Sequence, residues 1–350
     1  MNIAIDITPL HTGHRNRGVG MYTKLLIEAL QEHENNHLYY FFTRGQKIPN
    51  DVELIHYPYF DPFFITLPLF YDKPTVVTVH DLIPLVFPKH FPAGIRGSVK
   101  WIIQRWSLSR LNRLIVDSKA SRQDIERIAG IQAMKIDVIY LAPSPSFHPI
   151  HNASLLHNIK AKYHLPERFI LYVGDVNWNK NVEGLIRAFA ILRRNKNEKT
   201  LLVLAGEAFQ KRAISEVSRI NELIASMNMG EAVIHPGYIK PEDLPAVYSL
   251  ATVYVQPSFY EGFGLPVLEA LACGTPVVCS REASLAEIAG PSFVIDPRDI
   301  EDIATKIRAV IDMRESDRSE AARKGMEWVK QFSWRRVASE TVKSYETTIS

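Results

Sequence analysis

Short apolar runs, rich in β-branched and aromatic residues, recur along the chain and mostly alternate with helical or loop segments. In the first half they cover residues 2–7, 38–43, 52–57, 75–80, 113–117 and 135–141. In the second half they cover residues 169–174, 200–205, 232–235, 251–256, 276–279 and 292–295. Strands separated by helices predict parallel sheets with helices on both faces. Two such sets predict an α/β chain with two Rossmann-like domains.

Proline density breaks the periodic pattern in residues 143–166 and marks the predicted domain boundary. We expect a first domain over residues 1–165 and a second over residues 166–330. Ligands of open α/β sheets bind at the C-terminal ends of the strands. A ligand is therefore expected in a cleft between these two domains.

Two glutamates, Glu261 and Glu269, bracket a short loop and the start of a predicted helix. The preceding residues 251–258 are β-branched and aromatic and predict a buried strand. Pro266 suits a first helical position, and Gly274 suits the left-handed residue that ends a helix. Glu261 is thus expected in the loop and Glu269 in the early helix.

The loop between the glutamates contains Gly262, Phe263, Gly264 and Leu265. Glycines allow the backbone to approach a ligand, and amides at a helix start lack intrahelical partners and can donate to phosphate or hydroxyl oxygens. A carboxylate on either side can bind vicinal hydroxyls, which sugars and ribose both offer. The segment predicts a sugar-nucleotide site. The structural alternative is that one glutamate caps a turn and the other suits the positive helix end.

Two glutamates separated by seven residues, with Glu-Gly-Phe-Gly-Leu-Pro between them, resemble the signature of family 4 of the retaining glycosyltransferases. The resemblance covers nearly the whole chain, including a closing segment after Gln331. It implies the B-type glycosyltransferase fold, in which two Rossmann-like domains face each other across a cleft. The helix over residues 331–350 would then cross back to the first domain. It also implies that Glu261 meets the donor sugar and Glu269 the nucleotide ribose.

Gly18 and Gly20 place backbone amides at the N-terminus of another predicted helix, where a diphosphate can be received. About ten residues separate them from the preceding strand, and no third glycine follows at the dinucleotide spacing, so a nicotinamide site is disfavoured. The family has a flexible glycine loop here, beside the donor phosphates and the acceptor.

His80 and Asp81 follow a predicted strand, at the edge where an open α/β domain presents ligand contacts. A solitary His-Asp pair is more often structural. The family has a histidine at this strand end near the donor sugar, so the resemblance implies that His80 contacts the sugar from the first domain.

Lys180 lies in a polar loop before a predicted helix, where it could neutralise a departing diphosphate. Lys180 and Asn181 match a Lys-Asn dipeptide of the family, whereas Asn179 stands where the family often has arginine. Arg17 is a candidate to supply the missing charge. The structural alternative for Lys180 is a solvated charge at a helix start.

Other polar residues are expected to have structural roles. Ser284 and Glu287 fit a capping box, and Ser118 is expected to cap a helix. Cys273 and Cys279 are the two cysteines and are expected to be small buried residues, which suits a reducing cytosol.

Charge is uneven along the chain. Residues 1–165 hold 18 Lys and Arg against 13 Asp and Glu, and the remainder hold 23 against 25. Residues 95–113 mix apolar and basic side chains as a membrane-surface helix would, although a core-facing helix with a basic outer side has the same pattern. Together with the apolar residues 60–70, this pattern predicts reversible contact with an anionic membrane. No run approaches the roughly 20 apolar residues that cross a bilayer.

We therefore predict a cytoplasmic, peripheral, retaining enzyme that transfers a hexose from a nucleoside-diphosphate sugar to a glycan or polyprenyl-diphosphate-linked acceptor. The loop from Gly174 to Asn181 resembles bacterial mannosyltransferases of surface polysaccharide assembly, which favours GDP-mannose over a UDP-sugar. No Asp-x-Asp triplet occurs, so activity without metal or other cofactor is expected. The start of the chain has a strand pattern without a basic leader. The sequence has no internal repeat and no zinc-ligand spacing. It also lacks an aromatic platform of the kind that binds nucleic acid.

Three other activities compete with this prediction. A glycoside phosphorylase has a related architecture but is expected to carry a pyridoxal phosphate lysine and a longer chain. A sugar-nucleotide epimerase of similar fold would need no acceptor. A non-catalytic subunit would bind nucleotide sugar without transferring it.

Overall fold

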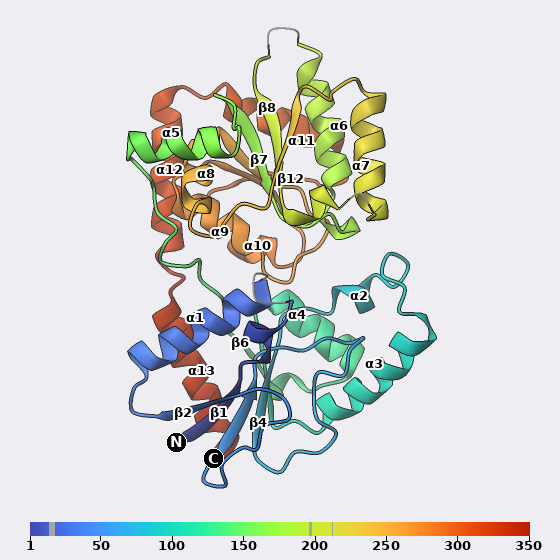
Figure 1. Ribbon diagram of the computed structural model, residues 1–350, viewed down its shortest axis with the longest axis vertical. Coiled ribbons are helices and arrows are strands. Elements are labelled where there is room, and N and C mark those ends of the chain that lie inside the picture. The colour runs from blue at the N-terminus through green and yellow to red at the C-terminus, as the bar shows by residue number, and fades with distance from the viewer. Residues whose placement is uncertain (14–17, 196–197, 212) are drawn as a thin grey trace. The chain divides into compact units, whose positions relative to one another are not determined.

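The computed structural model describes residues 1–13, 18–195, 198–211 and 213–350 (Figure 1). The chain forms two compact units. Unit 1 comprises Met1–Ala142 and Phe332–Ser350, and unit 2 comprises Pro143–Gln331. Residues 143–165, which the sequence placed in the first domain, thus belong to unit 2, where helix α5 (Ala153–Lys162) packs against α8 (Leu244–Leu250).

Unit 1 contains a six-stranded sheet in the order β2-β1-β3-β4-β5-β6, and every neighbouring pair is parallel. Its strands are β1 (Asn2–Asp6), β2 (Leu38–Phe42), β3 (Leu54–Tyr57), β4 (Thr75–Val79), β5 (Arg113–Val116) and β6 (Ile136–Val138). Its helices are η1 (Thr8–His11), α1 (Gly18–His33), α2 (Ile83–Val86), α3 (Gly94–Ser109), α4 (Lys119–Asp124), the π-helical turn η2 (Ile125–Ala129), η3 (Ala133–Lys135) and α13 (Trp334–Ile349).

Helix α13 is the C-terminal part of unit 1. It packs against α1 and against strands β4 and β5. Val337, Ala338 and Tyr345 are buried in this contact, as are Leu26 and Leu30 on the facing part of α1. The last helix of the chain is therefore built into the core of the unit that begins with the first strand.

Unit 2 contains a second six-stranded parallel sheet, in the order β12-β11-β10-β7-β8-β9. Its strands are β7 (Phe169–Val173), β8 (Leu201–Ala205), β9 (Val233–Gly237), β10 (Val253–Gln256), β11 (Val277–Ser280) and β12 (Phe293–Ile295). Its helices are α5 (Ala153–Lys162), η4 (Trp178–Lys180), α6 (Val182–Arg193), η5 (Glu207–Gln210), α7 (Ser215–Ser226), α8 (Leu244–Leu250), α9 (Leu265–Ala272), α10 (Leu285–Ile288), α11 (Ile300–Ile311) and α12 (Glu315–Val329).

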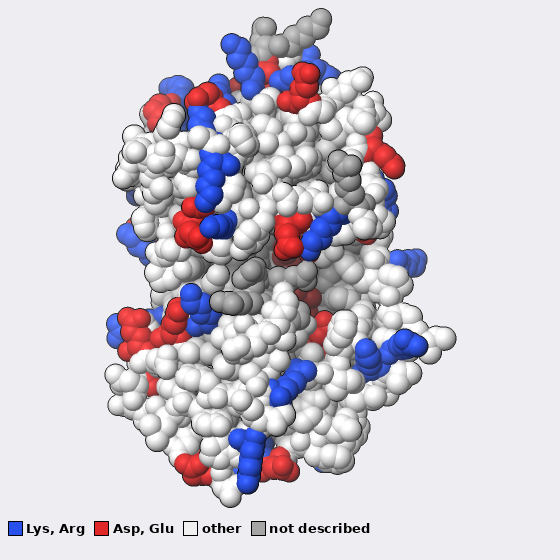
Figure 2. All heavy atoms as spheres, viewed as in Figure 1, with Lys and Arg blue, Asp and Glu red and all other residues white. Residues whose placement is uncertain are grey.

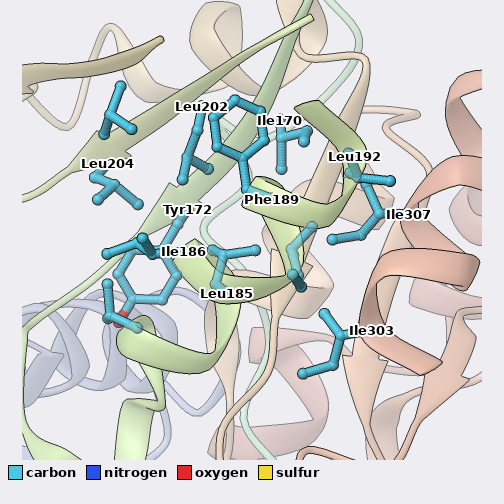
Figure 3. Packing of buried hydrophobic residues seen from close by; sticks show 14 of the residues in the cluster. Ile170, Tyr172, Leu185, Ile186, Phe189, Leu192, Leu202, Leu204, Ile303 and Ile307 are labelled. Carbon is cyan, nitrogen blue, oxygen red and sulfur yellow. The ribbon is translucent and has the colours of Figure 1, made fainter. Parts of the chain in front are cut away.

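The core of unit 2 forms where α6 packs on the sheet and on α11 (Figure 3). Phe189 of α6 points toward Ile170 and Leu202 of the sheet, while Leu192 lies beside Ile307 of α11. These positions recur on one side of α6, so its apolar stripe is buried and its basic residues face outward.

Helix α3 differs from α6, because its apolar side is exposed and its polar side is buried. Its buried side includes Gln104, whose amide donates to the Asp61 carbonyl at 3.2 Å and to Thr66 Oγ1 at 2.6 Å. Ile95 and Ile102, by contrast, are 86% and 67% exposed. Of the two alternatives for residues 95–113, the core-facing one does not hold for α3, because hydrogen bonds to the loop between β3 and β4 keep its polar side inward.

Each of the twelve predicted strands is present, with ends displaced by a few residues. The prediction of two parallel α/β sheets is confirmed. Fully buried parallel strands are the elements that continuous β-branched runs identify best, because both of their faces need apolar side chains.

Candidate active site

The loop between β10 and α9 has the conformation that its glycines suggested. Gly264 precedes α9 with a φ of 102°, and a Cβ there would lie 2.5 Å from Leu285 Cδ2. Only glycine fits such a position, since its backbone is left-handed and its space is filled. Pro266 lies in the first turn and Gly274 follows the helix with a φ of 76°, as predicted.

Glu261 is the most strongly bonded carboxylate of this loop. Lys180 Nζ donates to its Oε2 at 2.6 Å, while Gln256 Nε2 and Ser258 Oγ both donate to its Oε1 at 2.7 Å. Glu261 is only 5% exposed. A buried carboxylate is tolerable when cations and hydrogen-bond donors surround it. The structure thus brings together Lys180 and Glu261, which lie 81 positions apart in the sequence.

Asparagines on either side of Lys180 fix its position. Asn179 Nδ2 donates to the Tyr260 carbonyl at 2.9 Å. Asn181 is left-handed, with a φ of 53°, and its Nδ2 donates to the carbonyls of Pro257 at 3.1 Å and Pro297 at 2.7 Å. The polar loop after β7 is therefore bonded to the loop after β10. Both loops leave the C-terminal ends of adjacent parallel strands.

Glu269 lies in α9 and has a different environment. Its Oε2 accepts a hydrogen bond of 3.0 Å from the hydroxyl of Tyr248 in α8. Burial raises the pKa of Glu269 to about 7, and the Tyr248 hydrogen bond offsets only part of that rise. Around the glutamates, Gly262, Phe263 and Gly264 are buried and Leu265 is half-buried.

Ser284 does not form the predicted capping box, and this expectation is wrong. Its backbone is already helical, with a φ of −63°, so its hydroxyl is not placed to cap α10. Instead Ser284 Oγ donates to the carbonyls of Glu261 at 2.8 Å and Phe263 at 3.0 Å. The serine holds the loop that carries Glu261. This role of Ser284 was not predicted, although a polar residue shortly after β11 was a signal for it.

In unit 1, His80 directly follows β4 and pairs with Asp117, which directly follows β5. His80 Nδ1 lies 2.6 Å from Asp117 Oδ2, and both groups are largely buried. Burial alone would lower the pKa of His80, but the charge and hydrogen bond of Asp117 outweigh it and raise that pKa. Asp117 was not among the site residues predicted from the sequence. The signal was there, because Val79 and Val116 are register partners and the next residues therefore meet.

A chain of buried polar contacts links this histidine to α13. The ring of Tyr22 packs edge-on against His80 at 4.7 Å, and its hydroxyl lies 3.0 Å from Thr78 Oγ1. Thr78 Oγ1 lies 2.9 Å from His56 Nε2, and His56 Nδ1 lies 2.7 Å from the Tyr345 hydroxyl. Burial lowers the pKa of His56 to about 3, so this histidine is neutral.

The remaining predicted residues have simple positions. Gly18 and Gly20 form the first turn of α1, and Arg17 lies outside the described residues. The Asp81 carboxylate accepts a hydrogen bond of 2.9 Å from the Ile83 amide at the start of α2. Ser118 caps α4 as predicted, accepting from the Ser121 amide at 3.0 Å.

Within the described part of the chain, no group of three or more His, Cys, Asp or Glu is arranged to hold a metal ion. None of the helices in that part combines the length and apolar character needed to span a bilayer. Cys273 and Cys279 are both buried and unbridged, as expected.

Comparison with known proteins gives the family. A family model described as "Glycosyl transferases group 1" matches residues 157–327, and one described as "Glycosyltransferase Family 4" matches residues 38–142. The "O-antigen chain mannosyltransferase B" of Escherichia coli is 32% identical over 274 residues, which cover 77% of this chain and 70% of that protein. The chain belongs to glycosyltransferase family 4.

Other relatives of this family 4 glycosyltransferase are consistent with that assignment. The "Serotype-specific mannosyltransferase WbdA" of Escherichia coli is 30% identical over 232 residues. That match covers 65% of this chain and 28% of WbdA, so the chain corresponds to only part of that longer protein. The epimerase and the non-catalytic subunit are not favoured, because the relatives are glycosyltransferases.

Solved structures show the fold. The sucrose-phosphate synthase of Thermosynechococcus elongatus has a TM-score of 0.75 at 22% identity, with 99% of this chain and 98% of that chain covered. Anabaena HepE in complex with UDP and glucose has a TM-score of 0.74 at 16% identity, with 99% of each chain covered. The B-type glycosyltransferase fold predicted for this chain is confirmed.

Proposed function

We propose that this glycosyltransferase moves a mannosyl group from GDP-mannose to a hydroxyl of a lipid-linked glycan, with retention of configuration and without a metal ion. The observation that carries the proposal is the Lys180–Glu261 pair at the C-terminal ends of β7 and β10. This is the edge of a parallel sheet at which ligands of such folds bind.

Lys180 is the group proposed to stabilise the departing diphosphate. Negative charge grows on the phosphate oxygen as the glycosidic bond breaks, and a fixed cation in a partly desolvated site stabilises it strongly. Lys180 is mostly buried and held by flanking asparagines, so its ammonium group is positioned before substrate arrives. An arginine at position 179 would add a second charge, but Asn179 is used to hold Tyr260.

Glu261 is proposed to orient the donor sugar. Its Oε1 already accepts two hydrogen bonds, while Oε2 is bonded to Lys180. When a diphosphate attracts Lys180, Oε2 becomes available to accept from a sugar hydroxyl. A nucleophilic carboxylate would need to approach the anomeric carbon, and three donors restrain this one. That restraint supports the same-face route, in which the donor phosphate accepts the acceptor's proton.

Glu269 and His80 complete the proposed set of contacts. Glu269 would accept hydrogen bonds from the ribose hydroxyls, with Tyr248 fixing its carboxyl group. His80, held by Asp117, is proposed to meet the donor sugar, as in the family. Gly18 and Gly20 at the start of α1 are proposed to lie by the donor phosphates, together with the loop Gly262–Leu265.

Relatives support the choice of sugar and acceptor. The two Escherichia coli relatives are named as mannosyltransferases, one of the O-antigen chain, which favours mannose and a lipid-linked glycan acceptor at the inner face of the cell membrane. HepE was crystallised with UDP and glucose, so a UDP-sugar is the competing donor. Metal independence is supported by the fixed charge of Lys180 and by the lack of an Asp-x-Asp triplet in the sequence.

The test measures release of nucleoside diphosphate from a panel of GDP- and UDP-sugars in the presence of a chelator, with and without a polyprenyl-linked acceptor extract. We expect one donor, GDP-mannose, to be used, with release raised by the acceptor. Glu261→Gln should lower the rate at least about a hundredfold. Glu222→Gln, an exposed glutamate in α7, is the matched control and should not change it.

The reaction product tests whether the anomeric configuration is retained. Nuclear magnetic resonance of the transferred sugar should show the donor's anomeric configuration. Release that stops in chelator and returns with a divalent ion would contradict metal independence. Binding of nucleotide without turnover of any donor would contradict the transferase proposal and revive the non-catalytic subunit.

A further inference from the structure

Unit 1 exposes a large apolar surface on one side of α3. Ile95, Val99, Ile102 and Trp106 follow one another at spacings of four, three and four residues, so they lie on one helical face. All four are exposed. Contiguous exposed apolar surface of this size is uncommon on a protein that works free in water and marks an interaction site.

The loop between β3 and β4 extends this surface. Phe64, Ile65, Leu69 and Phe70 are also exposed, and Phe70 is 69% exposed. The Phe70 and Trp106 rings meet edge-on at 5.8 Å. We call these eight side chains the α3 face. They account for eight of the fourteen large exposed hydrophobic residues among those described, so the exposure is concentrated rather than scattered.

Basic residues lie beside the helical part of the α3 face, and two acidic residues, Asp61 and Asp72, flank its loop part. Between Asp81 and Asp117 there are six Lys and Arg and no Asp or Glu. Lys100 Nζ lies 4.9 Å from the centre of the Phe64 ring, and the Arg110 guanidinium lies 4.8 Å from that of Trp106. On the side of the molecule drawn in Figure 2, the surface over α3 likewise carries Lys and Arg atoms without Asp or Glu atoms.

The inner side of α3 shows that this orientation is built in. Gln104 and Ser107 are fully buried and donate hydrogen bonds to the loop, Ser107 to the Pro68 carbonyl. Rolling α3 to bury its isoleucines would break these bonds and leave buried polar groups without partners. The apolar side therefore stays outward in the folded unit.

We propose that the α3 face binds the surface of a bilayer that contains anionic lipids. Apolar and aromatic side chains would enter the boundary between headgroups and acyl chains, and the flanking cations would contact the headgroup phosphates. This inference rests on the proposed function, because docking on the bilayer would bring the enzyme to a lipid-linked acceptor. A symmetric second copy is a poorer occupant, because pairing this face with itself would bring its cations together.

The experiment is co-sedimentation of the full chain with vesicles of phosphatidylcholine alone and of phosphatidylcholine mixed with phosphatidylglycerol. We expect binding to the mixed vesicles, weaker binding to the neutral ones, and loss of the difference at high salt. Ile102→Glu should lower the partition coefficient at least about tenfold, because it removes apolar burial and adds a repelled charge. Lys100→Gln should lower it about fivefold.

Leu38→Glu is the matched control, since Leu38 is 71% exposed in β2 and lies outside the α3 face. It should bind vesicles as the unchanged chain does. Nucleoside diphosphate release without vesicles should be equal in all variants, which separates failure of docking from failure of the proposed transferase. Equal loss of binding in Leu38→Glu, or no binding to mixed vesicles by an active chain, would overturn the proposal. So would a dimer that Ile102→Glu dissociates, which would assign the face to a second copy.

Discussion

Each unit holds one buried charged pair, and the two pairs have similar chemistry but different hydrogen-bond support. In unit 2, both carboxylate oxygens of Glu261 accept hydrogen bonds, from Lys180, Gln256 and Ser258. In unit 1, Asp117 Oδ2 is bonded to His80, while Oδ1 is buried without a hydrogen-bond partner among the described residues. Loss of Lys180 leaves Glu261 with two hydrogen-bond donors, whereas loss of His80 leaves the Asp117 carboxylate without its bonded partner. We therefore expect unit 1 to depend more on its pair for stability, and unit 2 to depend on its pair mainly for catalysis.

The largest effect should come from Lys180→Met, which removes the cation of unit 2. Glu261 keeps two donors, so the chain should still fold, while the turnover rate should fall about a hundredfold to a thousandfold. The turnover number at saturating donor measures this directly. Lys199→Met, which removes an exposed lysine of unit 2, should leave the rate unchanged. An unchanged rate in Lys180→Met would mean that another group stabilises the departing diphosphate.

Asp117→Asn tests the charged pair of unit 1. His80 loses the carboxylate that raises its pKa, and we expect a loss of about 1.5 to 3 kcal/mol of stability. The raised pKa means that this contribution is present below pH 6.5 and is lost as the pH rises through the higher pKa of the folded state. Thermal unfolding against pH should therefore show a steeper decline above pH 6.5 in the unchanged chain than in the variant. Parallel curves would refute the charged pair.

Tyr345→Phe tests the last hydrogen bond in the series of buried polar contacts that links His80 to α13. The change leaves His56 Nδ1 buried without the hydroxyl that it contacts at 2.7 Å, at an expected cost of about 1 to 2 kcal/mol in the free energy of unfolding. Denaturant unfolding measures this cost. Tyr40→Phe, at an exposed position in β2, is the control and should have little effect. Equal stability of both variants would show that the buried contact contributes nothing net.

The smallest effect concerns Glu269, a carboxylate of unit 2 for which the described residues supply no cation partner. Its pKa of about 7 predicts that nucleoside diphosphate binding strengthens severalfold as the pH rises through 7, because the carboxylate accepts hydrogen bonds better than the acid. Calorimetric titration at several pH values should show this dependence. Glu269→Gln should show only the titration of the phosphate itself. The same raised pKa implies stability that is present below pH 4.5 and lost as the pH rises through about 7.

The sheets could be predicted from sequence because β-branched runs report burial on both faces of a strand. Helices were less certain for a physical reason. Both α6 and α3 have amphipathic patterns, yet α6 buries its apolar side and α3 exposes it. Periodicity shows that one side is apolar, but the partner that covers it is decided by the rest of the fold.

The candidate site was predictable where its residues fall within one motif. Glu261, Gly264, Pro266 and Glu269 came from a single stretch of sequence. Asp117 was missed because its significance depends on the neighbouring strand, which only the register of β4 and β5 shows. Ser284 was misassigned, since a capping-box spacing does not show whether the serine backbone is extended or already helical.

The division of unit 1 into residues before and after unit 2 also sets an order of events during synthesis. Unit 2 is one continuous stretch and can fold as soon as it has left the ribosome. Unit 1 cannot complete its core at that stage, because Tyr345 and the rest of α13 are made only after all of unit 2. Until then, His56 and the buried side of α1 lack these partners. The first half of the nascent chain therefore exposes apolar surface to which a chaperone can bind.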